Sequence, residues 1–193
     1  AAYRAAGLPG DIALLRGDED TLQRWTRFKS RYLIDFTNEL TAKVRSIRGP
    51  QVKTARNMYA QPIINPYSET WFAQNLDDFL AAYDWTAPMA MPLMENVPKG
   101  QENAWLDRLV DAVARRPGAL DRTVFELQAR DWRTGPGRPE ATPVDTAVLA
   151  GWMQRLQLRG ARSFGYYPDD FSQDQPRLQG IRPAISEAWY PLR

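Results

Sequence analysis

The sequence predicts an α/β fold that forms the C-terminal half of a (β/α)8, TIM-like barrel. First, one pattern appears four times along the chain: a short apolar segment, a polar or aromatic tip, and an amphipathic helix. Four is half the number of such units in a complete barrel. Second, strict alternation of strands and helices requires parallel strands joined by right-handed crossovers. Third, none of the strands is followed by the glycine-rich phosphate turn of a Rossmann sheet. An open four-stranded parallel sheet is the alternative.

The composition excludes several classes of chemistry. With 193 residues, 44% of them hydrophobic, the chain can bury a core. The 25 basic and 23 acidic residues nearly cancel, so the charge does not favour nucleic-acid binding, and no apolar run reaches the ~20 residues of a membrane span. Cysteine and histidine are absent, which excludes disulfides, thiol nucleophiles, histidine bases and the usual zinc sites. We expect no cofactor or metal in this segment.

A long amphipathic helix is expected over residues 18–48. Asp18 can cap it, and Gly49-Pro50 ends it. Its apolar residues recur every three or four positions, which predicts one buried stripe. This stripe consists of Leu22, Trp25, Phe28, Tyr32, Phe36, Leu40, Val44 and Ile47.

The four strands are expected at short apolar or alternating segments between helices. Ser68 can cap the helical region after the first strand, and this region is expected to break near Asn75. Pro88 in the second strand marks an edge or a bulge, and Pro143 fits the first position of a helix. We expect strands at 52–59, 86–91, 123–130 and 162–166, helices at 101–115 and 142–160, and short helical pieces over 177–190.

Glu126 is the most informative polar residue on a predicted strand. Alternation places Glu126 and Gln128 on one face of the third strand, and Phe125 and Leu127 on the other. If the apolar face packs on helices, Glu126 points into the barrel near its mouth, where burial of a charge is costly. Two readings remain open: a functional carboxylate, and a structural ion pair with an arginine such as Arg56.

Aromatic residues gather where strands end. Tyr59, Trp132 and Tyr167 follow or finish strands, and flat aromatic faces beside carboxylates suit sugar rings. Trp132 lies in a loop rich in glycine and proline, so it is expected to line a site or to anchor the loop. The tryptophans at helical spacing are expected in the core instead: Trp25, Trp71, Trp105 and Trp152.

Carboxylates follow the strands as well. Glu95, Asp131, Asp169 and Asp170 would join Glu126 to form an acidic mouth, which favours a cationic ligand. For Asp169 and Asp170, capping of the following segment is the alternative, because it is a common role of aspartate in loops.

Five ordered segments carry a family resemblance. They are Arg56-Asn57-Met58-Tyr59-Ala60, Trp71-Phe72-Ala73-Gln74-Asn75-Leu76, residues 83–92 from Tyr83-Asp84-Trp85 to Met91-Pro92, Phe125-Glu126-Leu127-Gln128, and Gly165-Tyr166-Tyr167-Pro168-Asp169-Asp170-Phe171. Together they resemble the C-terminal glycoside-hydrolase-like domain of the bacterial poly-β-1,6-N-acetyl-D-glucosamine N-deacetylases of biofilm export. The resemblance runs across essentially the whole chain.

The resemblance implies a two-domain periplasmic protein associated with the outer membrane, with an export porin as a partner. Its N-terminal domain would be a metal-dependent deacetylase, and its C-terminal barrel would bind and cleave the partly deacetylated polymer. Free glucosamine units are cationic, which agrees with an acidic mouth.

The resemblance also implies that residues 1–193 are the C-terminal portion of one barrel domain. The deacetylase domain and the first half of the barrel, with an Asp-Asp-rich catalytic motif, would precede it. Glycoside hydrolysis normally needs two carboxylates, and Glu126 is the one expected here. Alone, the segment is expected to bind weakly without turnover, and a non-catalytic carbohydrate-binding or export-scaffold domain is the alternative. The expected substrate contacts are Tyr59, Glu95, Gln128, Trp132, Tyr167, Asp169 and Asp170.

Overall fold

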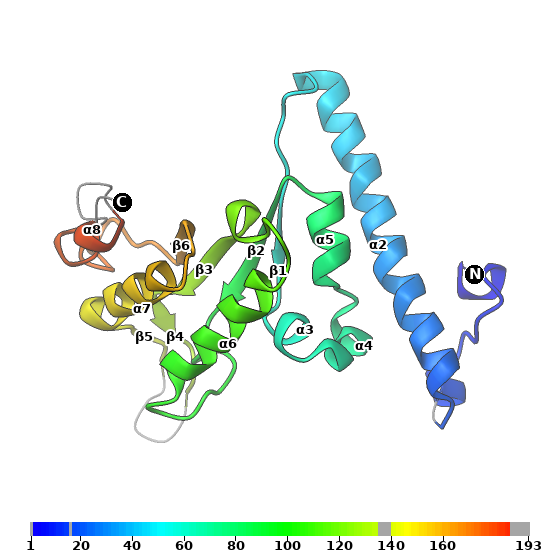
Figure 1. The fold of residues 1–193 in the computed structure, drawn as a ribbon, viewed down its shortest axis with the longest axis horizontal. Coiled ribbons are helices and arrows are strands. Elements are labelled where there is room, and N and C mark those ends of the chain that lie inside the picture. The colour runs from blue at the N-terminus through cyan, green and yellow to red at the C-terminus, as the bar shows by residue number, and fades with distance from the viewer. Residues whose placement is uncertain (1, 16, 135–139, 186–193) are drawn as a thin grey trace. The chain divides into compact units, whose positions relative to one another are not determined.

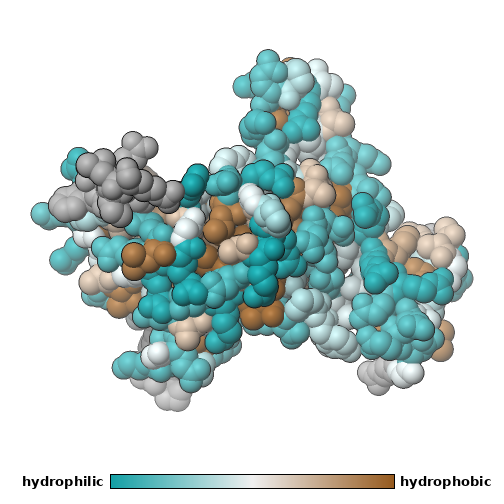
Figure 2. All heavy atoms as spheres, in the orientation of Figure 1, coloured by the Kyte–Doolittle hydropathy of each residue, from teal (hydrophilic) through white to brown (hydrophobic). Residues whose placement is uncertain are grey.

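The computed structural model describes residues 2–15, 17–134 and 140–185. The chain forms two compact units, Ala1–Asp84 and Trp85–Arg193. Figure 1 shows the course of the chain through its helices and strands. Hydrophilic residues cover most of the face shown in Figure 2, as expected when the apolar residues form cores.

The long helix of the first unit is confirmed as α2 (Glu19–Arg48). The Asp18 side chain accepts a hydrogen bond from the Thr21 amide at its start, and Gly49, with φ 98°, ends it. Glycine adopts this left-handed conformation without steric cost. α1 (Ala2–Ala5) and η1 (Ile12–Leu15) precede α2.

The prediction that one apolar stripe of α2 is buried is wrong for its second half. The buried residues are Thr26, Ser30 and Ile34 on a different face, which packs on the segments following the first strand. Small side chains at this face let helices approach closely. The large apolar side chains of α2 that remain exposed are Tyr32, Leu33, Phe36, Leu40, Val44 and Ile47.

The helical region after the first strand is broken, as predicted. Ala73 adopts a left-handed conformation with φ 53°, and the Asn75 side chain accepts from the Asp78 amide to start the next helix. Ser68 does not cap: its hydroxyl donates to the Asn65 carbonyl instead. The elements are β1 (Ala55–Met58), α3 (Gln61–Ile64), η2 (Pro66–Ser68), α4 (Glu69–Phe72) and α5 (Leu76–Ala82).

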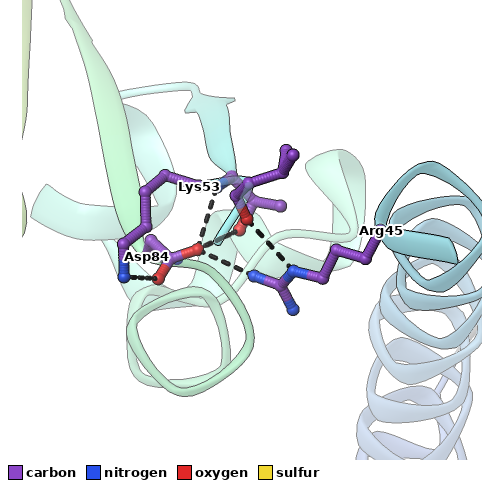
Figure 3. A network of polar contacts seen from close by, with 5 residues as sticks. Arg45, Lys53 and Asp84 are labelled. Atoms are coloured by element: carbon purple, nitrogen blue, oxygen red, sulfur yellow. Dashed lines mark hydrogen bonds and ion pairs between the residues drawn. The ribbon is translucent and has the colours of Figure 1, made fainter. Parts of the chain in front are cut away.

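A polar network joins α2 to the start of β1 and to the end of α5 (Figure 3). Asp84 accepts from Arg45 Nη2 at 3.0 Å and from Lys53 Nζ at 3.1 Å. It also accepts from the amide of Thr54 at 2.9 Å and from its hydroxyl at 3.0 Å. These hydrogen bonds, first that of the Thr54 amide and then that of Lys53, lower the Asp84 pKa from 3.8 to about 2. The carboxylate therefore holds three segments of the first unit together.

The second unit contains a parallel sheet with the order β2-β3-β6, formed by β2 (Trp85–Ala90), β3 (Val124–Gln128) and β6 (Ser163–Tyr167). Glu126 lies in register with Met89 on one side and with Gly165 on the other. Pro88 lies inside β2 without a register shift. The β2–β3 pairing includes Thr86 and then resumes at Met89, because proline has no amide hydrogen to donate between them.

Ion pairs connect two helices of the second unit. Arg155 on α7 binds Asp107 on α6 through Nε at 2.7 Å, and Arg159 binds Asp111 through Nη2 at 2.7 Å. The helices are α6 (Glu102–Ala114) and α7 (Thr146–Leu158). The pairs are spaced by four residues on each helix, so both lie one turn apart.

The predicted start of α7 at Thr142 is wrong. Asp145 is the N-cap and accepts from the amides of Ala147 and Val148. The preceding residues Thr142–Pro143 form β5, which pairs antiparallel with β4 (Arg130–Asp131). Pairing with a second strand thus outweighs the helix-start signal of the proline.

The core of the second unit lies on one face of β3. Phe125 and Leu127 are fully buried, and α7 packs against this strand. The expected alternation of strands and helices with parallel pairing is confirmed, and with it the α/β class. The tail forms α8 (Leu178–Ile185), while residues 186–190 of the predicted helical tail lie outside the described residues.

Candidate functional site

Glu126 lies in the middle of β3, between β2 and β6, on the face opposite Phe125 and Leu127. Its side chain is only partly buried, whereas those two neighbours are fully enclosed. Burial raises the pKa of the Glu126 carboxyl above its usual value. A carboxyl group of this kind keeps its proton to higher pH and can donate it to a leaving oxygen.

The position beside Glu126 on β6 has no side chain. Gly165 lies in register with Glu126, so both residues face the same side of the sheet. A Cβ atom at Gly165 would meet nothing within 4 Å, so this chain leaves open space next to the carboxyl group. Sequence reasoning did not select Gly165; a glycine inside a strand pattern was the available signal.

Two aromatic rings follow the carboxyl ends of these strands. Trp132 and Tyr167 stack with ring centroids 6.3 Å apart and an interplanar angle of 29°. Trp132 is 37% exposed and Tyr167 is 57% exposed, so the pair presents apolar ring area to solvent. An exposed pair of nearly parallel rings can support a sugar ring.

Gln128 does not have the role expected from the sequence. It is 0% exposed, so a direct substrate contact does not agree with its position. Its Oε1 atom accepts from the amides of Leu93 at 2.8 Å and Met94 at 3.1 Å, and its Nε2 atom donates to the Arg130 carbonyl at 2.8 Å. All three hydrogen bonds of the side chain are formed with backbone groups, and they satisfy the polar atoms of a buried amide.

The acidic groups of the second unit differ in how many partners they have. Asp131 is buried and forms a bidentate pair with Arg133, at 2.9 and 2.8 Å. Asp170 accepts from the Ser172 hydroxyl and the Gln173 amide, and these bonds, with Ser172 first, lower its pKa. Asp170 thus shapes its own turn, as the capping alternative proposed.

Two further predicted acidic contacts remain accessible. Glu95 lies partly buried in the turn that follows β2. Asp169 is exposed and accepts a hydrogen bond from the Tyr166 hydroxyl at 3.3 Å. The acidic mouth is therefore weaker than the sequence count suggests, because Asp131 is neutralised by Arg133.

Tyr59 belongs to the first unit, where it directly follows β1. Its ring packs on Phe72 with centroids 4.6 Å apart, and it is 40% exposed. Its amide donates to Gln74 Oε1 at 2.8 Å. Its predicted contact with substrate stays a prediction.

The core assignment of the helical tryptophans holds for two of them. Trp105 and Trp152 are 5% and 4% exposed, as predicted. Trp71 is 79% exposed, so its core assignment is wrong. It lines a hollow of about 730 Å³ in the first unit together with Trp25 and Tyr67. The short α4 helix presents Trp71 outward because Ala73 interrupts the helical pattern that predicted its burial.

The described part of the chain has neither a cluster of metal ligands nor a membrane-spanning helix. No group of three or more aspartate or glutamate side chains there is arranged to hold a metal ion. No helix among these residues is long and apolar enough to cross a membrane.

Parallel strands alternating with helices, with two exposed aromatic rings toward their carboxyl ends, place the chain in the class of α/β proteins with a β/α-barrel type of architecture. The family model of hypothetical glycosyl hydrolase family 13 matches residues 1–167, and the chain belongs to this family.

Named relatives agree with this assignment. The poly-β-1,6-N-acetyl-D-glucosamine N-deacetylases of Escherichia coli K12 and O157:H7 are each 48% identical over 190 residues, which is 98% of this chain and 28% of theirs. The solved glycoside hydrolase domain of PgaB (BpsB) from Bordetella bronchiseptica is 45% identical, with a TM-score of 0.84 over 96% of this chain and 50% of that chain. The family resemblance and the TIM-like fold class are thereby confirmed. The chain spans 28% of the length of the curated relatives.

Proposed function

We propose that this chain binds partly de-N-acetylated poly-β-1,6-N-acetyl-D-glucosamine and, within a complete barrel domain, takes part in its hydrolysis. The observation that carries the proposal is Glu126, a partly buried carboxyl group with a raised pKa beside the open space at Gly165. The stacked rings of Trp132 and Tyr167 supply a surface for the sugar. The names of the relatives support this polymer as the substrate.

The chemistry assigns Glu126 the role of proton donor. Hydrolysis of a glycosidic bond uses one carboxylic acid to protonate the leaving oxygen and one carboxylate as nucleophile or base. Burial keeps Glu126 protonated to higher pH than an exposed glutamate, which suits the first role. The second carboxylate would come from the earlier half of the barrel.

Completion by an earlier half-barrel is part of the proposal. The solved relative is a glycoside hydrolase domain about twice the length matched here, since this chain covers 50% of it. The exposed apolar residues of α2, such as Phe36, Leu40 and Ile47, form a helix face that would be stabilised by a neighbouring helix. We assign that neighbour to the preceding part of the same domain.

The substrate's charge agrees with the accessible carboxylates. Free glucosamine units carry an ammonium group, and Glu95 and Asp169 can attract it. By analogy with the family, the full protein would work in the periplasm at the outer membrane with an export porin, next to a metal-dependent deacetylase domain.

Substitution of Glu126 by Gln in the full-length protein tests the catalytic role. The substitution keeps the shape of the side chain and removes its proton, so polymer cleavage should fall by ~10²- to 10⁴-fold while polymer binding is retained. Chain shortening would be followed by mass spectrometry of the products. The 193-residue chain alone should bind weakly and release no shortened products; clear cleavage by it would contradict the half-barrel proposal.

The second candidate function is a non-catalytic carbohydrate-binding or export-scaffold domain. The exposed Trp132–Tyr167 pair would serve such a domain equally well. Unchanged cleavage in the Glu126→Gln protein, with binding that depends on Trp132, would favour this function.

A further inference from the structure

Gln128 joins the two loops that carry the candidate substrate contacts. Its Oε1 accepts two amide hydrogens from the loop after β2, those of Leu93 and Met94. Its Nε2 donates to the carbonyl of Arg130 in the segment after β3. The side chain is 0% exposed, so these three hydrogen bonds are shielded from competition by water.

Each bonded backbone group lies next to a candidate contact. Met94 directly precedes Glu95, and Arg130 lies two residues before Trp132. Gln128 is also in register with Tyr167, the ring on which Trp132 stacks. One buried amide therefore lies among the ends of β2, β3 and β6.

We propose that Gln128 is a positioning residue that sets the spacing between the Glu95 turn and the Trp132–Tyr167 rings. The inference rests on the proposed function, because the spacing matters for a polymer that engages both parts. Its side chain reaches the polymer only through the backbone that it holds.

Among side chains of this length, only glutamine supplies this set of hydrogen bonds at neutral pH; asparagine carries the same amide group on a side chain that is one methylene shorter. The amide oxygen accepts two hydrogens while the amide nitrogen donates one. An ionised glutamate would accept the two amides of Leu93 and Met94 but would face the Arg130 carbonyl with a second acceptor. A protonated glutamate would restore all three bonds, since its hydroxyl can donate.

The substitution Gln128→Glu in the full-length protein tests the proposal through its pH profile. Burial and the facing Arg130 carbonyl favour the protonated form of a carboxyl group at this position, whereas the amides of Leu93 and Met94 favour the ionised form, so affinity is measured across the range from pH 8 to pH 5. Affinity for partly deacetylated polymer should be about 10-fold weaker than wild type at pH 8 and should recover toward wild type as the pH falls to 5. The ratio of variant to wild-type affinity removes the pH dependence of the polymer itself.

Two further variants separate positioning from general stability. Gln157→Glu is the matched control, because Gln157 also donates to a backbone carbonyl, that of Ala184, but joins α7 to the following helix. It should change the melting temperature without a pH-dependent loss of polymer affinity. Gln128→Met fills the site without hydrogen bonds and should bind weakly at every pH.

Hydrogen exchange of peptides covering 91–99 and 129–134 gives a readout without polymer. The positioning role is supported if these peptides exchange faster in Gln128→Glu than in wild type at pH 8, and at the wild-type rate at pH 5. This result would support it even if the wild-type protein does not retain polymer, an outcome that would refute the proposed function alone. Unchanged exchange, or polymer affinity equal to wild type at both pH values, overturns the inference. So does an equal affinity loss in Gln157→Glu.

Discussion

Two carboxyl groups, one directly before a strand and one in the middle of a strand, have opposite environments. Asp84, at the start of β2, accepts hydrogen bonds from Arg45, Lys53 and Thr54, and its pKa falls to about 2. Glu126, in the middle of β3, has its pKa raised by burial and lies beside open space. The same functional group is thus fully ionised and saturated in one place, and holds a proton more strongly in the other.

The difference matches the structural role of Asp84 and the role proposed for Glu126. In parallel β/α architectures, the amino-terminal ends of strands serve stability and the carboxyl ends carry the chemistry. The carboxylate of Asp84 accepts hydrogen bonds from three residues of the first unit. Glu126 lies on the same sheet face as Tyr167, which stacks on Trp132. If the two roles differ in this way, substitutions near Glu126 should weaken polymer binding, and substitutions at Asp84 should lower stability.

The largest effect is expected at Gly165. Gly165→Leu places a side chain in the space beside Glu126, so polymer affinity of the full-length protein should fall by about 100-fold, or ~2.7 kcal/mol. The melting temperature of this chain should stay near wild type, because the glycine does not adopt a positive φ. Affinity would be measured by isothermal titration calorimetry.

Gly151→Ala is the control for this change. Gly151 lies within α7 and is exposed, with nothing within 4 Å of an added Cβ. Alanine there should stabilise the chain by about 0.5–1 kcal/mol without altering affinity. Equal affinity losses in both glycine variants would remove Gly165 from the site.

Removal of the exposed ring at Trp132 should have the next largest effect. Trp132→Ala should lower polymer affinity by about 10-fold, or ~1.4 kcal/mol, because a stacking surface is lost. Trp105→Phe, in the core, should lower stability and leave affinity unchanged. An unaltered affinity for Trp132→Ala would show that the ring anchors its loop and does not bind sugar.

Asp84→Ala should affect stability alone. It removes the four hydrogen bonds that the Asp84 carboxylate accepts in the network of Figure 3, so the melting temperature should fall by on the order of 5 °C, with polymer affinity unchanged. The wild-type advantage should be present above pH 4 and disappear as the pH falls from about 4 to about 2, because the folded-state pKa lies below 3.8. Thermal melts of both proteins between pH 2 and 7 provide the measurement.

The smallest effect is the stability change of Glu126→Gln. The folded-state pKa lies above the ordinary value of 4.5, so wild type loses stability relative to the variant as the pH rises through this range. The variant should match wild type at pH 4 and be at least as stable at pH 7, as judged by denaturant unfolding. A variant less stable at pH 7 than at pH 4, relative to wild type, would indicate that ionised Glu126 is held by a structural ion pair.

The sequence predicted the type and order of the strands and helices more reliably than the contacts of their faces. Periodicity located α2, yet its apolar side chains lie largely exposed while Thr26 and Ser30 are buried. The periodicity of apolar residues indicates which face of a helix can be buried. Which face is buried depends on the segments that pack against the helix. For the same reason Pro143 signalled a helix start, but a pairing with Arg130 places it in a strand.

The sequence pattern indicates which residues lie near the strand ends more readily than which contacts they make. Glu126, Trp132 and Tyr167 were selected from alternation and strand ends, and the structure places the two rings in contact. Hydrogen-bond partners distant in sequence cannot be read from spacing, which is why Gln128 was expected to face substrate and not to bind the backbone of Leu93. Gly165 became visible only through the register with Glu126.

The ion pairs between α6 and α7 also have a mechanical consequence. Asp107 and Asp111 meet Arg155 and Arg159 in matching order, so both helices run in the same direction. A slide of α7 by one turn, ~5.4 Å, would leave one acid and one arginine without a partner. β6 follows α7 directly in the order of elements. The two ion pairs, which restrict sliding of α7 along α6, therefore also restrict the position of the strand that ends at Tyr167. The height of an aromatic ring at the site is therefore set in part by charges on the outer helices.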